Sequence, residues 1–109
     1  LIEDHSAIGT PVHCGECISD IACDNLNLDL PPHVISKRVH GIRVIFPDGT
    51  AKKLSEEGYV LEKHLFERWI AEEAVSAGAQ LHLSHKLRSM EKQYDDSGNF
   101  TSWLCDGNG

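Results

Sequence analysis

Apolar residues recur with helical spacing in one stretch of the chain, residues 64–77. Its apolar face, with the spacing i, i+4, i+8 and i+11, consists of Phe66, Ile70, Ala74 and Ala77. Gly78 follows at once, and glycine is the residue that most often ends a helix in the left-handed conformation. The pattern predicts one main helix here. A weaker version of the same pattern predicts a shorter helix over residues 18–26.

Short runs of β-branched and apolar residues predict strands in the rest of the chain. The predicted strands are residues 39–46, 50–54, 59–61, 80–85, 87–94 and 100–105. Pro47-Asp48-Gly49 is a turn sequence, because proline presets its own dihedral and glycine accepts a positive one. Residues 95–99 form a second polar turn. Two β-hairpins follow from these turns, whereas residues 1–4 are predicted to be a strand end and residues 5–17 a loop.

The predicted elements indicate a mixed α+β fold with one main helix and two β-hairpins. The order of elements is compatible with one βαβ crossover, from residues 59–61 through the main helix to residues 80–85. Within residues 80–85, His82 and His85 are an odd number of positions apart, which places them on opposite faces of a strand. They are therefore expected to be surface residues rather than partners in a site.

Composition and charge exclude several classes of function. The chain has 109 residues, enough for one small domain, and a formal net charge of -7 from 10 basic and 17 acidic residues. Nucleic acid is excluded as the main partner, because binding to phosphates requires a basic face. No apolar run approaches the roughly 20 residues of a membrane-spanning helix, so no transmembrane segment is expected.

The cysteines are unevenly distributed. Cys14, Cys17 and Cys23 lie close together, and Cys105 lies near the other end of the chain. A secreted scaffold usually spreads its disulfides through a shorter chain that is richer in cysteine. Reduced thiols and a cytoplasmic location are therefore expected.

The segment richest in chemical groups is residues 9–17, Gly-Thr-Pro-Val-His-Cys-Gly-Glu-Cys. The C-x2-C spacing of Cys14 and Cys17, with Cys23 nearby, is compatible with zinc, although no second ligand pair follows at the usual spacing. A redox dithiol needs its first thiol at a helix N-terminus. A cofactor-facing loop would use Gly15 for the close approach of backbone amides and Cys14 as a side chain facing the reaction chamber. Inert cysteines are the remaining interpretation, and the residues alone leave all of these open.

Glu3 ends the apolar opening Leu1-Ile2. In dinucleotide-binding folds, an acid at the tip of the second strand binds a ribose hydroxyl, about 20 residues after a glycine-rich turn. The sequence holds no such turn before Glu3. Because the chain starts on Leu1 rather than methionine, and its apolar start leads directly into an acid, we expect it to be a piece of a larger enzyme.

Several sequence blocks, in the same order, resemble the geranylgeranyl reductase family, within the flavoproteins that share the p-hydroxybenzoate hydroxylase fold. The blocks are Leu-Ile-Glu at 1–3, Ile-Gly-Thr-Pro-Val-His-Cys-Gly-Glu at 8–16, Pro-Asp-Gly at 47–49, Tyr-Val-Leu-Glu-Lys-His-Leu-Phe-Glu-Arg-Trp-Ile-Ala at 59–71 and Ala-Gly-Ala at 77–79. The P-x-x-C-G-E pattern is fairly specific to this family. The block from Tyr59 onward is shared by many flavoprotein monooxygenases and reductases.

The resemblance implies FAD as the cofactor and suggests which residues bind it. Glu3 corresponds to the acid that holds the adenosine ribose of FAD. Cys14 and Gly15 correspond to loop residues that line the chamber for flavin and substrate, and Cys14 is the candidate catalytic residue. His13 and Lys63 stand where the family usually has arginine. They are candidate cofactor-binding residues whose contacts differ, because both lack the planar guanidinium group.

For the whole enzyme, the resemblance implies an FAD-dependent oxidoreductase that reduces the double bonds of geranylgeranyl-type isoprenoids. NAD(P)H or another reductant would be the electron donor. Residues 1–109 would be a single segment of a larger FAD-binding domain, lacking the G-x-G-x-x-G turn and the C-terminal part. A hydrophobic isoprenoid substrate would also allow peripheral contact with a membrane. The alternatives are a flavoprotein hydroxylase of the same fold and a small zinc-binding module that uses Cys14, Cys17 and Cys23.

Overall fold

The computed structural model describes residues 1–14 and 16–108. Its elements, in chain order, are β1 (Cys17–Ser19), α1 (Asp20–Leu26), the 3-10 turn η1 (Pro32–Val34), β2 (Ile35–Val39), β3 (Ile42–Ile45), β4 (Ala51–Leu54), β5 (Gly58–Leu61), α2 (Lys63–Ser76), β6 (Lys86–Tyr94) and β7 (Phe100–Asn108). The fold is mixed α+β, with α2 as its main helix, and this confirms the predicted fold class.

The strands form three separate antiparallel groups. β5 lies between β1 and β2 in a three-stranded sheet, while β3 pairs with β4 and β6 pairs with β7. Both predicted hairpins are therefore confirmed. Their turns also form as predicted, because Gly49 and Gly98 adopt positive φ and Gly49 N–H donates to Phe46 O over 2.9 Å.

Helix α2 runs within one residue of its predicted bounds. After its last turn, Gly78 adopts a φ of 99° and donates to Val75 O, while Ala79 donates to Ala74 O, both over 2.9 Å. These two bonds form a Schellman motif, which satisfies carbonyls that the end of the helix would otherwise leave unpaired. Gly78 therefore ends the helix as the sequence predicts.

The predictions for residues 17–46 need correction. The run 39–46 is divided in two, since Val39 ends β2 and Ile42 begins β3. The shorter helix begins at Asp20 rather than Ile18, because Ile18 belongs to β1. Strands β1 and β2 were not predicted, and both are short edge strands that form by pairing with β5. Such strands carry little local pattern of their own.

Residues 80–85 are not the regular strand that the sequence predicts. Within them only His82 forms a bridge, parallel to Ile2, and Ser84 adopts a φ of 57° that breaks the extended conformation. The expected βαβ crossover from β5 is therefore wrong, because β5 pairs with β1 and β2 instead. The expected separation of His82 and His85 is also wrong, since their ring centroids are 5.6 Å apart.

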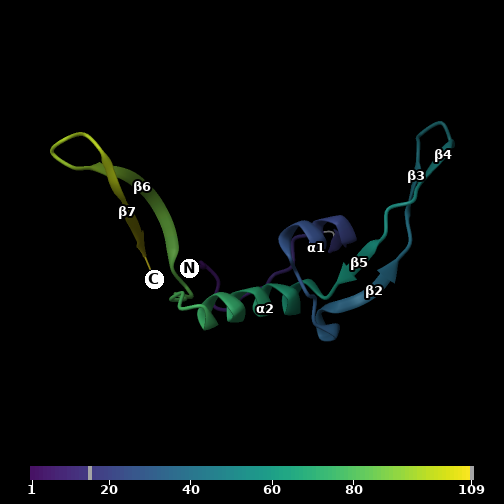
Figure 1. The fold of residues 1–109 in the computed structure, drawn as a ribbon, viewed down its shortest axis with the longest axis horizontal. Helices are drawn as coiled ribbons and strands as arrows, with labels where there is room; N and C mark the ends of the chain where they lie inside the picture. The colour runs from purple at the N-terminus through teal and green to yellow at the C-terminus, as the bar shows by residue number, and fades with distance from the viewer. Residues whose placement is uncertain (15, 109) are drawn as a thin grey trace.

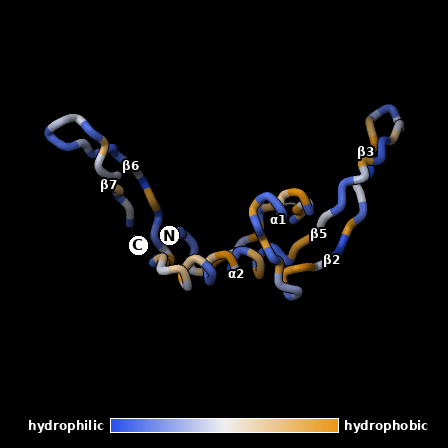
Figure 2. The backbone as a smooth tube through the Cα atoms, in the orientation of Figure 1, coloured by the Kyte–Doolittle hydropathy of each residue, from blue (hydrophilic) through white to orange (hydrophobic). Residues whose placement is uncertain are grey.

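The molecule is elongated, with extents of 60 × 32 × 26 Å, and its two hairpins project at opposite ends (Figure 1). The buried apolar side chains of the described residues are Cys23, Val34, Leu61 and Ala71. They belong to the central part, around α1, η1, β5 and α2, whereas both hairpins carry apolar residues that remain exposed (Figure 2). No helix of the described residues is both long and apolar enough to cross a membrane.

Candidate functional site

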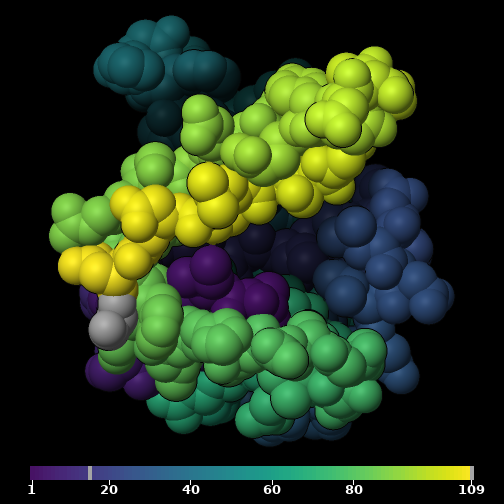
Figure 3. All heavy atoms as spheres, turned by 90° about the vertical axis from the view of Figure 1, so that its left-hand side faces the viewer, coloured from purple at the N-terminus to yellow at the C-terminus, as the bar shows by residue number. Residues whose placement is uncertain are grey.

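The N-terminal residues are fixed by backbone hydrogen bonds to the segment after α2. The backbone nitrogen of Leu1 donates to Gln80 O over 2.7 Å, and His82 N–H donates to Leu1 O over 3.0 Å. Glu3 N–H donates to His82 O over 3.0 Å, and Glu3 O accepts from His85 N–H over 2.9 Å. Figure 3 shows these N-terminal residues recessed between α2 and the β6–β7 hairpin. Glu3 is therefore held in place by its own backbone.

The loop after Glu3 packs against the first turn of α2 through Gly9. Gly9 is buried, with a φ of 76°, and a Cβ atom there would lie 2.7 Å from the carbonyl oxygen of His64. Only glycine accepts both this φ and this close approach without strain. Gly9 therefore sets the position of the following loop, which carries His13 and Cys14, against the helix.

Three of the predicted site residues come together around one cavity. Glu3, His13 and Cys14 line a hollow of about 280 Å³, called here the polar hollow. The rest of its wall is formed by Asp4, His5, Glu67 and the segment Gly9–Pro11. The structure thus brings Glu3 and the cysteine-bearing loop to one cavity.

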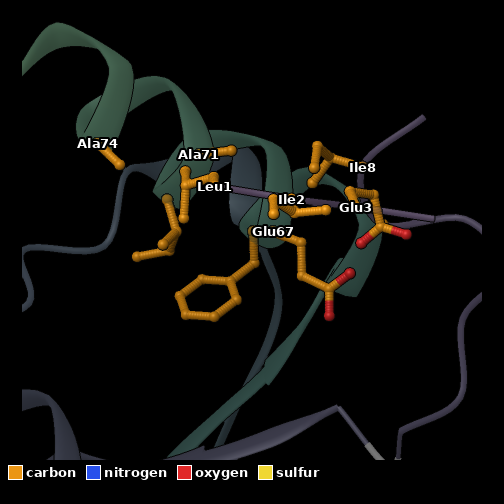
Figure 4. Close-up of a pocket in the computed structure, with 10 residues that line it drawn as sticks. Leu1, Ile2, Glu3, Ile8, Glu67, Ala71 and Ala74 are labelled. Atoms are coloured by element: carbon orange, nitrogen blue, oxygen red, sulfur yellow. The ribbon is translucent and has the colours of Figure 1, made fainter. Parts of the chain in front are cut away.

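A second cavity, of about 340 Å³, adjoins the first and is called here the apolar hollow. It is lined mainly by Leu1, Ile2, Ile8, Phe66, Ile70, Ala71 and Ala74. Glu3, Gly9 and Glu67 border both hollows. Figure 4 shows the carboxylates of Glu3 and Glu67 toward one end of the apolar hollow and Ala74 at the other. The polar hollow and the apolar hollow thus meet at the carboxylates of Glu3 and Glu67.

At the polar hollow, two acids and one histidine form a network with Lys86. Glu3 Oε1 accepts from the backbone N–H of His5 over 2.9 Å and lies 2.5 Å from His5 Nδ1. The same ring nitrogen is 3.0 Å from Asp4 Oδ1, and Lys86 Nζ is 3.5 Å from Asp4 Oδ2. Burial acts to raise the pKa of Asp4, but His5 and Lys86 together outweigh it, so the pKa lies below its ordinary value. Asp4 is therefore ionised at neutral pH.

The other two predicted cofactor residues differ in what the structure describes. Gly15 lies outside the described residues. Lys63 begins α2, and its side chain, 19% exposed, pairs with Glu67 one turn later rather than lining the polar hollow. Lys63 therefore reaches the hollow only through Glu67. Sequence reasoning missed Glu67, although its i,i+4 spacing from Lys63 is a signal for an ion pair on a helix.

The cysteines do not form a metal site among the described residues. Cys17 lies in β1 and is exposed, whereas Cys23 is buried in α1. Burial raises the pKa of the Cys23 thiol, and Asp20 and Asp24 raise it further, so Cys23 is a poor thiolate ligand. In the described part of the chain, the only close group of three or more residues with ligand atoms is Glu3, Asp4 and His5. The geometry does not favour the zinc-binding alternative.

The donors and acceptors around the polar hollow fit part of a dinucleotide rather than all of it. Carboxylates such as Glu3 accept hydrogen bonds from hydroxyl groups, as ribose binding requires. The volume of about 280 Å³ is at the lower limit of ligand pockets, which span roughly 300–1,000 Å³. The described residues therefore supply one wall of a dinucleotide site rather than the whole site.

Two known proteins that are similar to this chain in sequence carry the name of one kind of reductase. No protein-family model matches the chain. It is 32% identical over 114 residues to digeranylgeranylglycerophospholipid reductase 1 of Methanothermobacter thermautotrophicus, covering 98% of this chain and 28% of the relative. It is 36% identical over 87 residues to the digeranylgeranylglycerophospholipid reductase of Methanothrix thermoacetophila, covering 74% of this chain and 22% of the relative.

A solved structure agrees with these sequence relatives. The crystal structure of a geranylgeranyl bacteriochlorophyll reductase-like protein from Thermoplasma acidophilum is similar, with a TM-score of 0.76 and 29% identity. The match covers 84% of this chain and 25% of that one. The chain thus spans about a quarter of the length of the proteins it matches. By sequence and by fold, the chain belongs to the geranylgeranyl reductase family.

Proposed function

We propose that residues 1–109 are one segment of a larger FAD-binding oxidoreductase domain that reduces double bonds of geranylgeranyl-type isoprenoids. The relatives support this proposal, because two are named reductases of digeranylgeranylglycerophospholipids and the chain spans about a quarter of their length. In the proposed enzyme, this chain supplies one wall of the chamber for flavin and substrate.

The observation that carries the proposal is the shared polar hollow of Glu3, His13 and Cys14. An acid at the N-terminal segment and a thiol in the following loop have no packing reason to meet. Their convergence beside the glycine-docked loop is the arrangement expected of a ligand site.

Each residue has a definite task in this proposal. Glu3 accepts hydrogen bonds from the ribose hydroxyls of FAD, and His5 fixes the orientation of its carboxylate. When bound, reduced FAD supplies the hydride for the reduction, and NAD(P)H or another reductant restores its electrons. Cys14 holds a thiol proton at the exposed edge of the hollow, where it can protonate the second carbon of the double bond. His13 would contact the cofactor from the wall of the polar hollow. Lys63 lies outside that wall and would reach the cofactor only if its side chain turned away from Glu67.

The apolar hollow supports a hydrophobic substrate class, because its lining is aliphatic and aromatic apart from the two carboxylates. A lipid-borne isoprenoid would bring the enzyme into peripheral contact with a membrane surface. Reduced thiols and a cytoplasmic location fit the same assignment.

The test uses the full-length protein that contains this chain, purified with and without added FAD. We expect the visible absorbance of bound flavin, and reduction of a geranylgeranyl lipid by the reduced enzyme. Cys14→Ser is expected to keep the flavin and to lose most of the reduction rate, since general acid catalysis contributes about 10²–10⁴-fold.

Cys105→Ser is the matched control, because Cys105 is also an exposed free cysteine but lies in β7, outside both hollows. It is expected to leave flavin content and rate unchanged. A well-folded, colourless full-length protein that does not take up FAD would contradict the proposal.

A further inference from the structure

The β3–β4 hairpin is positively charged, although the chain as a whole is negative. Residues 42–54 hold three basic residues and one acidic residue, whereas the whole chain holds 10 basic and 17 acidic residues. The three cations are Arg43, Lys52 and Lys53, and none of them forms an ion pair within the described part of the chain. The hairpin projects from one end of the elongated molecule (Figure 1). An anionic surface would therefore attract this end and repel the more acidic remainder.

Two of these cations face each other across the hairpin. The register places Arg43 directly opposite Lys53. Like charges in directly opposite positions of an antiparallel pair destabilise that pair. An anionic group bound beside both side chains would remove the repulsion. The register of the hairpin therefore favours a partner with negative charge.

The same hairpin exposes apolar side chains beside the cations. Ile45 is 67% exposed and Phe46 is 45% exposed, next to the turn, while Ile42 and Leu54 are exposed at the other end of the hairpin. Figure 2 shows hydrophobic residues along β3 in this projecting part of the chain. A free phosphate gives such side chains no apolar surface to contact. A membrane of anionic lipid presents phosphates and an apolar boundary together.

The acid in the turn limits how deeply the hairpin can enter such a membrane. Asp48 Oδ1 accepts from the Thr50 hydroxyl over 2.7 Å and from Thr50 N–H over 2.9 Å. These two bonds hold the pKa of Asp48 below its ordinary value, so Asp48 is ionised at neutral pH. Withdrawing a carboxylate from water is costly. The turn therefore stays at the level of the lipid headgroups, where the neighbouring Ile45 and Phe46 reach the apolar boundary.

We propose that the β3–β4 hairpin is a membrane-contact element, which binds anionic lipid through its three cations and through the exposed side chains of Ile45 and Phe46. The inference rests on the proposed function, because an isoprenoid carried by a phospholipid lies in a membrane. Bound in this way, the hairpin brings the enzyme to the surface that holds its substrate, and the acidic remainder of the described chain is kept away from the headgroups.

The test is sedimentation of the full-length protein with vesicles of equal parts phosphatidylglycerol and phosphatidylcholine, and with vesicles of phosphatidylcholine alone. The wild type is expected to bind the anionic vesicles more tightly, and added salt should weaken that binding. Arg43→Gln with Lys53→Gln should lower the partition coefficient about thirtyfold, because each cation near an anionic surface contributes about fivefold. This variant removes a cross-strand repulsion, so it has no reason to fold less well.

Arg88→Gln with Lys92→Gln is the matched control for the charges. It also removes one arginine and one lysine from an exposed hairpin, but from β6, at the other end of the molecule (Figure 1). The control should leave the partition coefficient unchanged, because charges more than a Debye length from the membrane are screened.

Ile45→Ser tests the apolar part of the contact. It should lower the partition coefficient several-fold at every salt concentration, because apolar burial does not depend on charge. Ile21→Ser is its control, since Ile21 is similarly exposed, at 63%, but lies in α1. That variant should bind the anionic vesicles as the wild type does.

The outcomes separate this inference from the function on which it rests. A protein that contains flavin and reduces detergent-dispersed substrate, but binds neither kind of vesicle or binds both equally, would overturn the inference and leave the proposed function standing. Equal partitioning of the Arg43→Gln, Lys53→Gln variant and its control would do the same. Equally slow hydrogen exchange of β3 and β4 with and without vesicles would also overturn the inference, because another part of the full-length protein would then cover the hairpin. A protein that binds anionic vesicles through the hairpin but takes up no FAD would contradict the proposed function alone.

Discussion

Arg38 joins three parts of the chain through one guanidinium group. It pairs with Asp20 at the start of α1 and, over 2.8 Å, with Glu57 just before β5. Its guanidinium carbon also lies 4.6 Å from the ring centre of Tyr59 in the central strand. The flat, permanently charged group makes all of these contacts at once, which a lysine could not do. This cluster ties α1 to the three-stranded sheet.

The Arg38 cluster predicts a dependence of stability on acid. The pKa of Glu57 lies below its ordinary value near 4.5, because Arg38 donates a hydrogen bond to it and the ring nitrogen Nδ1 of His40 lies 3.4 Å from its Oε1. A carboxyl group whose pKa is lowered by folding contributes stability that is fully present above its unfolded value and is lost as the pH falls through the folded value. Glu57→Gln is therefore expected to lose a small amount of stability at neutral pH and to show a shallower loss below pH 4.5.

Urea unfolding of the full-length protein at several acidic and neutral pH values would measure this difference. Glu56→Gln is the control, since Glu56 is an exposed neighbour without an ion pair among the described residues. If the free energy of unfolding falls with the same slope below pH 4.5 in wild type and Glu57→Gln, the Arg38 cluster does not stabilise the fold through Glu57.

Among the elements, the contact between the loop and α2 decides the geometry of the site. The helix is a regular platform whose end is closed by the Schellman motif and whose residues Phe66, Ile70 and Ala74 line the apolar hollow. The loop has no regular structure of its own between Asp4 and Cys14. It takes its position from Gly9 on the helix backbone and from Glu3 on the segment after the helix. The site thus depends on two elements that are distant in sequence.

Gly9→Ala is expected to weaken this contact. The new Cβ would lie 2.7 Å from the carbonyl oxygen and 2.8 Å from the Cα of His64, and neither backbone atom can move without shifting the helix. Overpacking of this kind typically costs about 1–3 kcal/mol. We expect lower stability by thermal unfolding, and weaker FAD binding because the polar hollow is displaced.

Gly98→Ala is the control for that experiment. Gly98 also has a positive φ, of 80°, but no heavy atom lies within 4 Å of its added Cβ. The free energy of unfolding of this variant should fall by only about 1 kcal/mol, because alanine tolerates a positive φ less well than glycine does. Its affinity for FAD should be unchanged. Equal FAD affinities for wild type and Gly9→Ala would show that the loop does not depend on this contact.

The whole molecule is more open than its length requires. Its radius of gyration is 19.3 Å, whereas a compact domain of this size has about 13 Å. Its accessible surface is 8236 Å², against about 6,000 Å² for a folded monomer of equal mass. The β6–β7 hairpin exposes the apolar or aromatic side chains of Met90, Tyr94, Phe100, Trp103 and Leu104. An isolated two-stranded hairpin has marginal stability in water.

This openness predicts different behaviour for the chain alone and in the full-length protein. Alone, residues 1–109 are expected to bind a hydrophobic dye strongly and to exchange the amide hydrogens of β6 and β7 rapidly, because nothing covers these strands. In the full-length protein, the same amides should be protected. Hydrogen exchange measured by mass spectrometry on both forms tests this. Full protection in the isolated chain would contradict it.

The sequence by itself determined the elements whose signals are local. The apolar spacing of α2, its closing Gly78 and the turns of both hairpins depend on neighbours a few residues away. The same is true of the i,i+4 spacing of Lys63 and Glu67. The candidate residues Glu3, His13 and Cys14 could also be selected, because their residue types and order resemble a family pattern.

Only the tertiary structure decided which distant segments meet. The short strands β1 and β2 exist because β5 offers hydrogen bonds to both, and the pairing of Ile2 with His82 replaced the expected crossover. Neither is encoded in local periodicity. Likewise, the shared hollow of Glu3 and Cys14 arises because Gly9 fits against His64 and because Glu3 bonds to the backbone beyond α2. Close packing between remote backbones is a property of the folded chain, so no pattern along the sequence could have specified it.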